Sequence, residues 1–114
     1  MHELSITSTI IGMVEEECLG NEIEKPKTVI LEIGQFTTYS AESIIFYYDI
    51  LKIDSKMLKD STLSVEEIEG VVECADCGKS SNIKDPILIF CMHCNSNDVK
   101  IVSGKELNIK SIIG

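Results

Sequence analysis

Cys74-Ala-Asp-Cys77, followed by Cys91-Met-His-Cys94, is the stretch that decides how the C-terminal part of this 114-residue chain is held together. Each pair has the C-x2-C spacing, which directs two sulfur atoms into one hollow, and thirteen residues (78–90) separate the pairs. Two such pairs supply four thiolates in a tetrahedron, the arrangement that Zn²⁺ prefers in a closed structural site. The spacing therefore predicts that all four cysteines bind one structural zinc ion.

Iron, as in a rubredoxin, is the chemical competitor for this site, because tetrahedral sulfur also suits that metal. His93 lies inside the second pair. The simpler interpretation of His93 is an exposed residue of the metal-binding turn. The alternative is a spare ligand that replaces a thiolate when the pH or a second metal changes the site.

The residues around the cysteines predict a lobe that is stabilised by a metal ion and inserted into another domain. Residues 73–103 contain one compact apolar run, Ile87-Leu-Ile-Phe90, which is too short to form a core without a metal. The tail Glu106-Leu-Asn-Ile-Lys110 alternates like a strand, and we expect it to pair with the sheet of the first half. The predicted domains are residues 1–72 plus 105–114, and a zinc-binding lobe of residues 73–104.

The first half of the chain alternates between helical and strand patterns. Apolar residues at helical spacing predict a helix over residues 4–19, with Cys18 as a small core residue. Residues 28–34 read as a strand, Ser40 or Ser43 caps a second helix, and a strand follows near 61–72. The expected fold is α+β: two helices packed on a small, mainly antiparallel sheet, with an inserted zinc-ribbon-like lobe. The predicted helical stripes are Ile6, Ile10, Met13, Val14 and Cys18, and Ile44, Ile45, Tyr48 and Leu51.

Composition favours a protein partner over nucleic acid. The net charge is −9, and the ten basic residues are all lysines. Arginine is the usual reader of phosphates and guanines, so its absence argues against nucleic-acid binding. Residues 1–69 hold fourteen acids against five lysines, a surface that suits cations or a basic partner. With no apolar run of membrane-spanning length and no secretory signal, we expect a cytoplasmic location and reduced cysteines.

The N-terminus Met1-His2-Glu3 offers a second set of metal ligands. The α-amine of Met1 and the amide and ring nitrogens of His2 can close fused chelate rings on one ion. Such a near-planar nitrogen array favours Ni²⁺ or Cu²⁺ over zinc. The alternative is an ordinary chain end without a function, with Glu3 acting only as a favourable acid at a helix start.

The motifs of an active site are missing from the sequence. It has no glycine-rich phosphate loop, and its two histidines are remote from each other without a serine–histidine–acid spacing. Four thiolates also leave zinc no open position for hydrolytic chemistry. We therefore expect a protein that is not an enzyme.

Taken together, these features resemble the HypA/HybF family of hydrogenase maturation proteins, which are nickel-insertion metallochaperones. The resemblance is carried by the Met1-His2-Glu3-Leu4-Ser5-Ile6 start, the strand ending in Ile33-Gly34, the paired cysteines, and the closing Gly104-Lys-Glu-Leu-Asn-Ile109. It implies an α+β nickel domain with a four-cysteine zinc lobe.

The resemblance also implies functional residues and partners. Nickel would be bound by the Met1 amine, His2 and nearby backbone nitrogens, with Glu3 shaping the site or the partner contact. Cys74, Cys77, Cys91 and Cys94 would bind zinc. The implied partners are the HypB GTPase and the precursor of the [NiFe]-hydrogenase large subunit, and a homodimer is compatible with the sequence.

The chain departs from the family pattern at two places. Ser40 stands where many relatives carry an acid near the nickel site, with Glu42 two residues further on. Met92-His93 stands where relatives often have a proline after the third cysteine. Two rival functions remain: a zinc-ribbon protein-interaction or nucleic-acid module without a nickel role, and a rubredoxin-like electron carrier.

Overall fold

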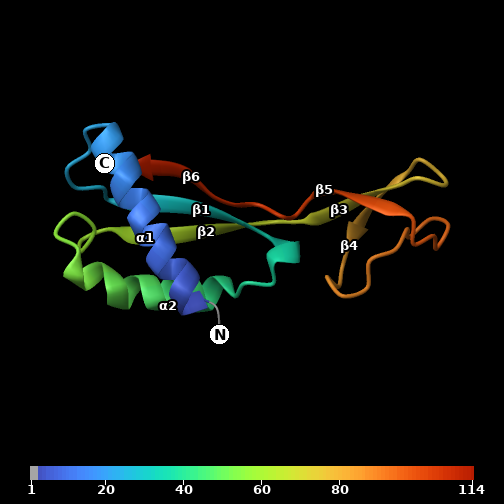
Figure 1. Cartoon of the computed structure of the whole chain (residues 1–114), viewed down its shortest axis with the longest axis horizontal. Helices are drawn as coiled ribbons and strands as arrows, with labels where there is room; N and C mark the ends of the chain where they lie inside the picture. The colour runs from blue at the N-terminus through green and yellow to red at the C-terminus, as the bar shows by residue number, and fades with distance from the viewer. Residues whose placement is uncertain (1–2) are drawn as a thin grey trace. The chain divides into compact units, whose positions relative to one another are not determined.

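The structure is a computed structural model that describes residues 3–114 (Figure 1). Within those residues the chain forms two α-helices, six β-strands and two short 3₁₀ helices. In chain order these are α1 (Glu3–Gly20), β1 (Thr28–Gly34), η1 (Gln35–Thr37), α2 (Ala41–Leu51), η2 (Lys52–Asp54), β2 (Thr62–Ile68), β3 (Gly70–Cys74), β4 (Ser80–Ile83), β5 (Val99–Ser103) and β6 (Leu107–Ile113). No helix in this part of the chain is long and apolar enough to cross a membrane.

The described chain divides into two compact units. Unit 1 contains residues 3–32, 39–66 and 108–114, and unit 2 contains residues 33–38 and 67–107. The long segment that carries all four paired cysteines is thus inserted between β2 and β6 in the sequence. The predicted α+β fold, with two helices, small sheets and an inserted four-cysteine lobe, is confirmed.

The first sheet has the strand order β2-β1-β6. The Lys27 amide donates to the Ile113 carbonyl at 2.7 Å, and the Gly34 amide donates to the Glu106 carbonyl at 2.6 Å. From Lys27 to Gly34 the residue number rises, whereas the number of the bonded residue falls from Ile113 to Glu106, so β6 runs antiparallel to β1. The C-terminal strand therefore returns to the sheet of the first half, as its alternating pattern predicted.

Helix α1 buries a narrow stripe of side chains in the core of unit 1. Thr7, Ile10, Val14 and Cys18 are buried at three- and four-residue steps, whereas Met13 is 39% exposed. The predicted place of Met13 in this stripe is wrong, and Thr7 takes the buried position instead. Its hydroxyl donates to the Glu3 carbonyl at 2.5 Å, which satisfies the buried polar group. Burial also raises the pKa of the Cys18 thiol, as expected for a core cysteine.

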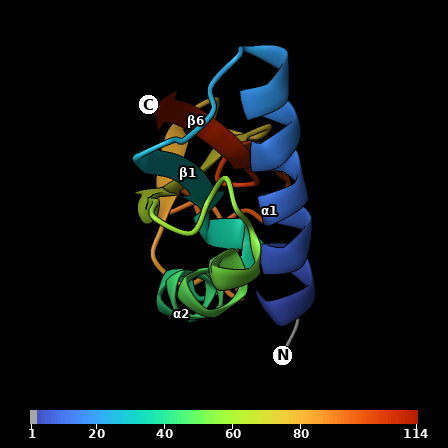
Figure 2. The same cartoon turned by 90° about the vertical axis from the view of Figure 1, so that its left-hand side faces the viewer.

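Helix α2 begins at a side-chain cap and packs against α1 (Figure 2). The Ser40 hydroxyl accepts a hydrogen bond from the Ser43 amide at 3.2 Å, so Ser40, rather than Ser43, is the N-cap residue. Ile44 and Tyr48, one turn apart, are completely buried. This is the amphipathic pattern that the sequence indicated for the second helix.

The hydroxyl group of Tyr48 lies in the core, where a short chain of hydrogen bonds satisfies this polar group. The Ser61 hydroxyl donates to the Leu58 carbonyl at 2.6 Å, and it lies 2.5 Å from the Tyr48 hydroxyl. Because Ser61 has one hydroxyl hydrogen, Tyr48 is the donor in the second bond. Desolvation by burial raises the pKa of Tyr48, which keeps it in the donating, neutral form.

Replacing Tyr48 with phenylalanine is expected to lower the free energy of unfolding by about 1 kcal/mol, because the Ser61 oxygen loses a buried donor. Urea titration of both proteins measures this difference. Tyr48→Leu, which also loses ring volume, should cost more. Equal stability of Tyr48→Phe and the parent would show that the hydroxyl contributes nothing to stability.

The second sheet has the order β4-β3-β5, and both ladders are antiparallel. The single strand predicted near 61–72 is therefore wrong: β2 and β3 belong to different sheets, with Glu69 between them. Between β2 and β3, side chains form hydrogen bonds with backbone groups. The Gly70 amide donates to Gln35 Oε1 at 2.8 Å, and the Glu69 carbonyl accepts from the Ser103 hydroxyl at 2.9 Å. These bonds pair the Gly70 amide and the Glu69 carbonyl where the chain passes from one sheet to the other.

Candidate metal centre

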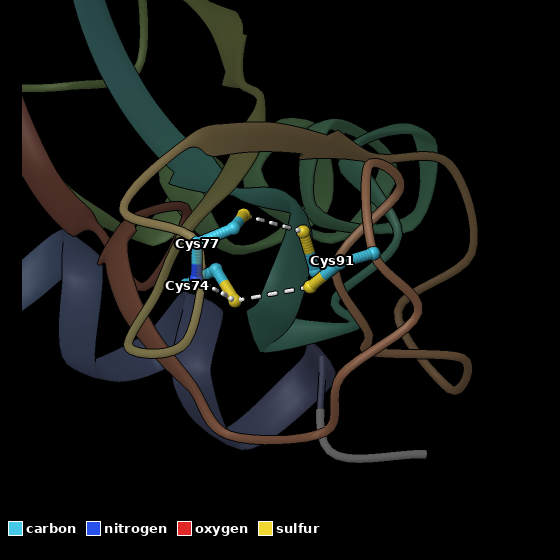
Figure 3. Close-up of side chains that lie close together, drawn as sticks. Cys74, Cys77 and Cys91 are labelled. Carbon is cyan, nitrogen blue, oxygen red and sulfur yellow. Dashed lines mark hydrogen bonds between the residues drawn. The ribbon is translucent and has the colours of Figure 1, made fainter.

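Two turns of unit 2 bring the four predicted cysteine ligands together. Cys74 is the last residue of β3, Cys77 follows in the turn to β4, and the other pair lies in the turn before β5. The four sulfur atoms all lie within 4.8 Å of one another. Cys74 Sγ is 3.6 Å from Cys94 Sγ, and Cys77 Sγ is 3.6 Å from Cys91 Sγ. Figure 3 shows the sulfurs of Cys74, Cys77 and Cys91 pointing into the same space.

The two cysteine turns share one backbone geometry. The Gly78 amide donates to the Cys74 carbonyl at 3.0 Å, and the Asn95 amide donates to the Cys91 carbonyl at 2.8 Å. Both donors have positive φ angles, 74° for Gly78 and 63° for Asn95. Glycine and asparagine are the residues that tolerate this conformation best. Their shared position, directly after the second cysteine of each pair, is a sequence signal that our interpretation of the spacing did not use.

Hydrogen-bond donors surround the sulfur atoms. The Cys77 amide lies 3.4 Å from Cys74 Sγ, and the His93 amide lies 3.3 Å from Cys91 Sγ. The buried hydroxyl of Ser81 lies 3.9 Å from Cys91 Sγ and accepts the Met92 amide at 3.1 Å. Such donors orient ligands and stabilise negative sulfur. Sequence analysis missed Ser81, because a lone serine in β4 carries no motif.

The thiols of the cluster differ in acidity. Burial opposes ionisation of Cys91, but the amides of Cys94 and His93 donate to its sulfur and lower its pKa to about 6. The Ser96 amide favours ionisation of Cys94, but the neighbouring Cys74 sulfur and burial raise its pKa to about 12. Four thiols this close do not all ionise without a cation among them.

The cluster fits zinc in the number, chemistry and spacing of its donors. A tetrahedral ion with Zn–S bonds of about 2.3 Å places its sulfurs about 3.8 Å apart. The 3.6 Å separations in the cluster are close to that value. Cys74 and Cys91 are buried, and Cys77 and Cys94 are exposed, so the site lies at the edge of unit 2. Four thiolates close the coordination shell, which is the pattern of a structural site rather than a catalytic one.

His93 does not join the four sulfurs. Its side chain is exposed, and Nε2 lies 3.1 Å from the Ser80 carbonyl oxygen. In the tautomer with hydrogen on Nε2, the ring donates to this carbonyl and ties the second cysteine turn to β4. This contact favours the interpretation of His93 as a residue of the turn.

Of the predicted N-terminal ligands, Met1 and His2 lie outside the described residues. Glu3 is the first residue of α1, and its carboxylate accepts the Ser40 amide at 3.0 Å. Ser40 is the N-cap of α2, so Glu3 joins the beginnings of both helices in unit 1. Glu42 lies exposed in the first turn of α2.

These features define a class of protein: an α+β domain that carries an inserted four-cysteine, zinc-ribbon-like lobe. Over residues 1–113 the sequence matches the family described as hydrogenase/urease nickel incorporation metallochaperone HypA. The chain belongs to the HypA family, and it is a metallochaperone of nickel incorporation in hydrogenase maturation.

Individual relatives agree with this assignment. The hydrogenase maturation factor HypA of Rippkaea orientalis is 39% identical over 112 residues, which cover 98% of this chain and 94% of that protein. The factor of Methanococcus maripaludis strain C7 is 30% identical over 116 residues, with coverage of 96% and 91%. The solution structure of the Ni metallochaperone HypA from Helicobacter pylori has a TM-score of 0.72 and 26% identity, and the match covers 99% of this chain and 97% of that one.

Proposed function

We propose that this chain binds Ni²⁺ at its N-terminus and delivers it for the maturation of [NiFe]-hydrogenase. The nickel ligands are the α-amine of Met1 and the nitrogens of His2, with Glu3 completing or shaping the site. The observation that carries the proposal is the family match, which begins at residue 1 and therefore includes this triplet. Nitrogen ligands in a near-planar array suit Ni²⁺, which is the cargo rather than a resident cofactor.

The contact made by Glu3 supports a role for this residue beside the nickel site. Its carboxylate accepts the Ser40 amide at 3.0 Å, so the start of α1 is joined to the cap of α2. The contact therefore holds the carboxylate of Glu3, which directly follows the proposed ligands in the sequence.

The second part of the proposal concerns the cysteines. Cys74, Cys77, Cys91 and Cys94 hold Zn²⁺ as a permanent structural ion in the lobe of residues 73–104, whereas residues 1–72 plus 105–114 form the nickel-binding domain. The sulfur spacing supports this assignment because it is near that of a tetrahedral zinc site. The zinc holds the lobe together as a scaffold.

We further propose that the chain acts in the cytoplasm, without catalysing a reaction, between two protein partners. The HypB GTPase is one, and the precursor of the hydrogenase large subunit, which receives the nickel, is the other. The net charge of −9 supports protein rather than nucleic-acid partners. A homodimer is compatible with the proposal and is not required by it.

Replacing His2 with alanine is expected to remove stoichiometric nickel binding. Loss of a ring-nitrogen ligand should weaken binding more than loss of a supporting residue, which costs on the order of 10- to 100-fold. Titration calorimetry with Ni²⁺ on untagged, zinc-loaded protein measures the effect. An N-terminal tag is avoided, because it blocks the proposed amine ligand.

The other histidine provides the matched control. His93→Ala removes an exposed imidazole from unit 2 and should leave one nickel bound per chain with unchanged affinity. If both variants bind nickel like the parent, the N-terminal site is wrong. The chain would then be a zinc-stapled interaction module without a nickel role at its N-terminus.

A further inference from the structure

Helix α2 and the adjoining η2 present a row of large apolar side chains to solvent. Phe46 is 60% exposed, Ile50 is 49% exposed and Ile53 is 67% exposed. Their spacing of four and three residues places them along one side of the helical segment. We call these three residues the α2 outer face.

The α2 outer face is distinct from the side of α2 that packs in the core of unit 1. Ile44 and Tyr48 are completely buried on the opposite side of the helix. A surface helix of a globular protein has one apolar stripe and a polar opposite face. Here both sides of the helix carry large apolar side chains, and several exposed apolar side chains on one face indicate a site of interaction. The Phe46 ring is also held edge-on by Tyr47, at 5.4 Å between centroids, which reduces its freedom before any partner binds.

Acidic side chains border the outer face. Glu42, Asp49 and Asp54 are all exposed along the same segment. Lys52 is the one basic residue in the sequence from 41 to 54. Its ammonium group lies 3.2 Å from Asp49 Oδ1 and donates to the Ser61 carbonyl at 2.7 Å, so it is turned toward the core of unit 1. Residues 41–54 therefore carry net negative charge, with three acids against one lysine.

We propose that the α2 outer face is a docking surface for an amphipathic helix of a partner protein, one with an apolar stripe flanked by lysine or arginine. Apolar side chains at three- and four-residue spacing fit the stripe of a second helix. The acidic border selects basic flanks and speeds association. A second copy of this chain fits less well, because a twofold contact through this face would set the same acids against each other.

This inference goes beyond the proposed function, because neither the nickel ligands nor the zinc ligands belong to the outer face. The test uses a designed helical peptide with leucines at i, i+4 and i+7 and lysines on both flanks. A second peptide has glutamates in place of the lysines. Fluorescence anisotropy at low salt should show micromolar binding of the lysine peptide, weakening as salt rises, and no binding of the glutamate peptide.

Variants of the protein locate the binding surface. The double substitution Phe46→Ala/Ile50→Ala should weaken binding of the lysine peptide about tenfold or more, because buried aromatic and aliphatic anchors carry most of an interface's affinity. Alanine keeps the helix, since it has the highest helix propensity. Asp49→Asn/Asp54→Asn should keep binding but reduce its dependence on salt.

The matched control removes exposed apolar surface elsewhere. Ile87 and Leu88 in unit 2 are 84% and 60% exposed, so Ile87→Ala/Leu88→Ala should bind the lysine peptide as the parent does. The proposal is overturned if the two peptides bind equally, if neither binds, or if Phe46→Ala/Ile50→Ala has no effect. It is also overturned if sedimentation shows that the parent dimerises and the same double variant is a monomer. All four proteins should bind nickel and zinc alike, which separates this outcome from that of the nickel proposal.

Discussion

Replacing Cys91 with serine is expected to abolish zinc binding and to unfold unit 2. The buried apolar residues that the structure describes in this unit are Ile33, Val72 and Ile83, together with the ligands Cys74 and Cys91. Two of these five are themselves metal ligands, so little apolar core remains without the ion. Structural zinc contributes on the order of 10 kcal/mol to the folding of small lobes, which three aliphatic side chains do not replace.

Zinc content by mass spectrometry and amide spectra by NMR measure the two effects separately. Amides of β3, β4 and β5 should lose their dispersion in Cys91→Ser, whereas those of α1 and α2 should keep theirs. Unit 1 has its own buried core, which includes Val14, Leu31 and Tyr48. Chelation of zinc from the parent should reproduce the spectrum of the variant.

Cys18 supplies the control for this experiment. It is a cysteine of the α1 stripe, completely buried and outside the four-sulfur cluster. Cys18→Ala should retain one zinc ion per chain and a folded unit 2, at a modest cost in stability from the lost sulfur. A Cys91→Ser protein with a full zinc complement and intact β3–β5 amides would contradict the four-thiolate assignment.

The fold was predictable where the pattern was local. β1 spans Thr28–Gly34, as its alternating β-branched residues indicated, and α1 differs from the predicted helix by one residue at each end. The division between β2 and β3 was not predictable, because Glu66, Glu67 and Glu69 interrupt the apolar alternation without marking where one strand ends. What separates the two strands is long-range: Gly70 is bonded to the side chain of Gln35, which is remote in the sequence. No pattern in a single segment reports such a contact.

The convergence of the four cysteine sulfurs was predictable from residue type and spacing. The groups that surround those sulfurs were not. Ser81 reaches Cys91 only because β4 pairs beside β3, and that register depends on the whole lobe. The outer face of α2 was missed for a different reason. The predicted stripe named the side of the helix that the core uses, but the sequence does not show that Phe46 and Ile50 on the other side stay uncovered.

Replacing Gly34 with alanine is expected to be the most damaging single-methyl change in the chain. An added Cβ would lie 2.1 Å from the Gly104 carbonyl oxygen, 2.2 Å from the Gly104 carbonyl carbon and 2.7 Å from the Glu106 nitrogen. All three are backbone atoms, so the rotation of a side chain cannot relieve the clash. The conformation of Gly34 is an ordinary extended one (φ −78°, ψ 147°), which makes the effect purely steric.

The backbone of Gly104, which faces Gly34, has little room to move away. Gly104 has a φ of 106°, and a Cβ there would lie 2.7 Å from the Gly70 Cα, so three glycines pack together in unit 2. The Phe36 amide also donates to the Gly104 carbonyl at 2.8 Å, and shifting that carbonyl would break the bond. We expect Gly34→Ala to lower the free energy of unfolding by about 3 kcal/mol, which corresponds to a fall of about 10 °C in the melting temperature.

Gly12→Ala makes the same chemical change where there is room. Gly12 lies in the exposed middle of α1, and an added Cβ would meet nothing within 4 Å. Alanine there should raise stability by about 0.5–1 kcal/mol, because it restricts the unfolded chain and favours the helix. Calorimetric melting of zinc-loaded protein compares both variants with the parent. Gly34→Ala melting at the temperature of the parent would mean that Gly34 and Gly104 do not pack at the distance described, whereas opposite shifts for the two variants would place the close backbone contact in unit 2.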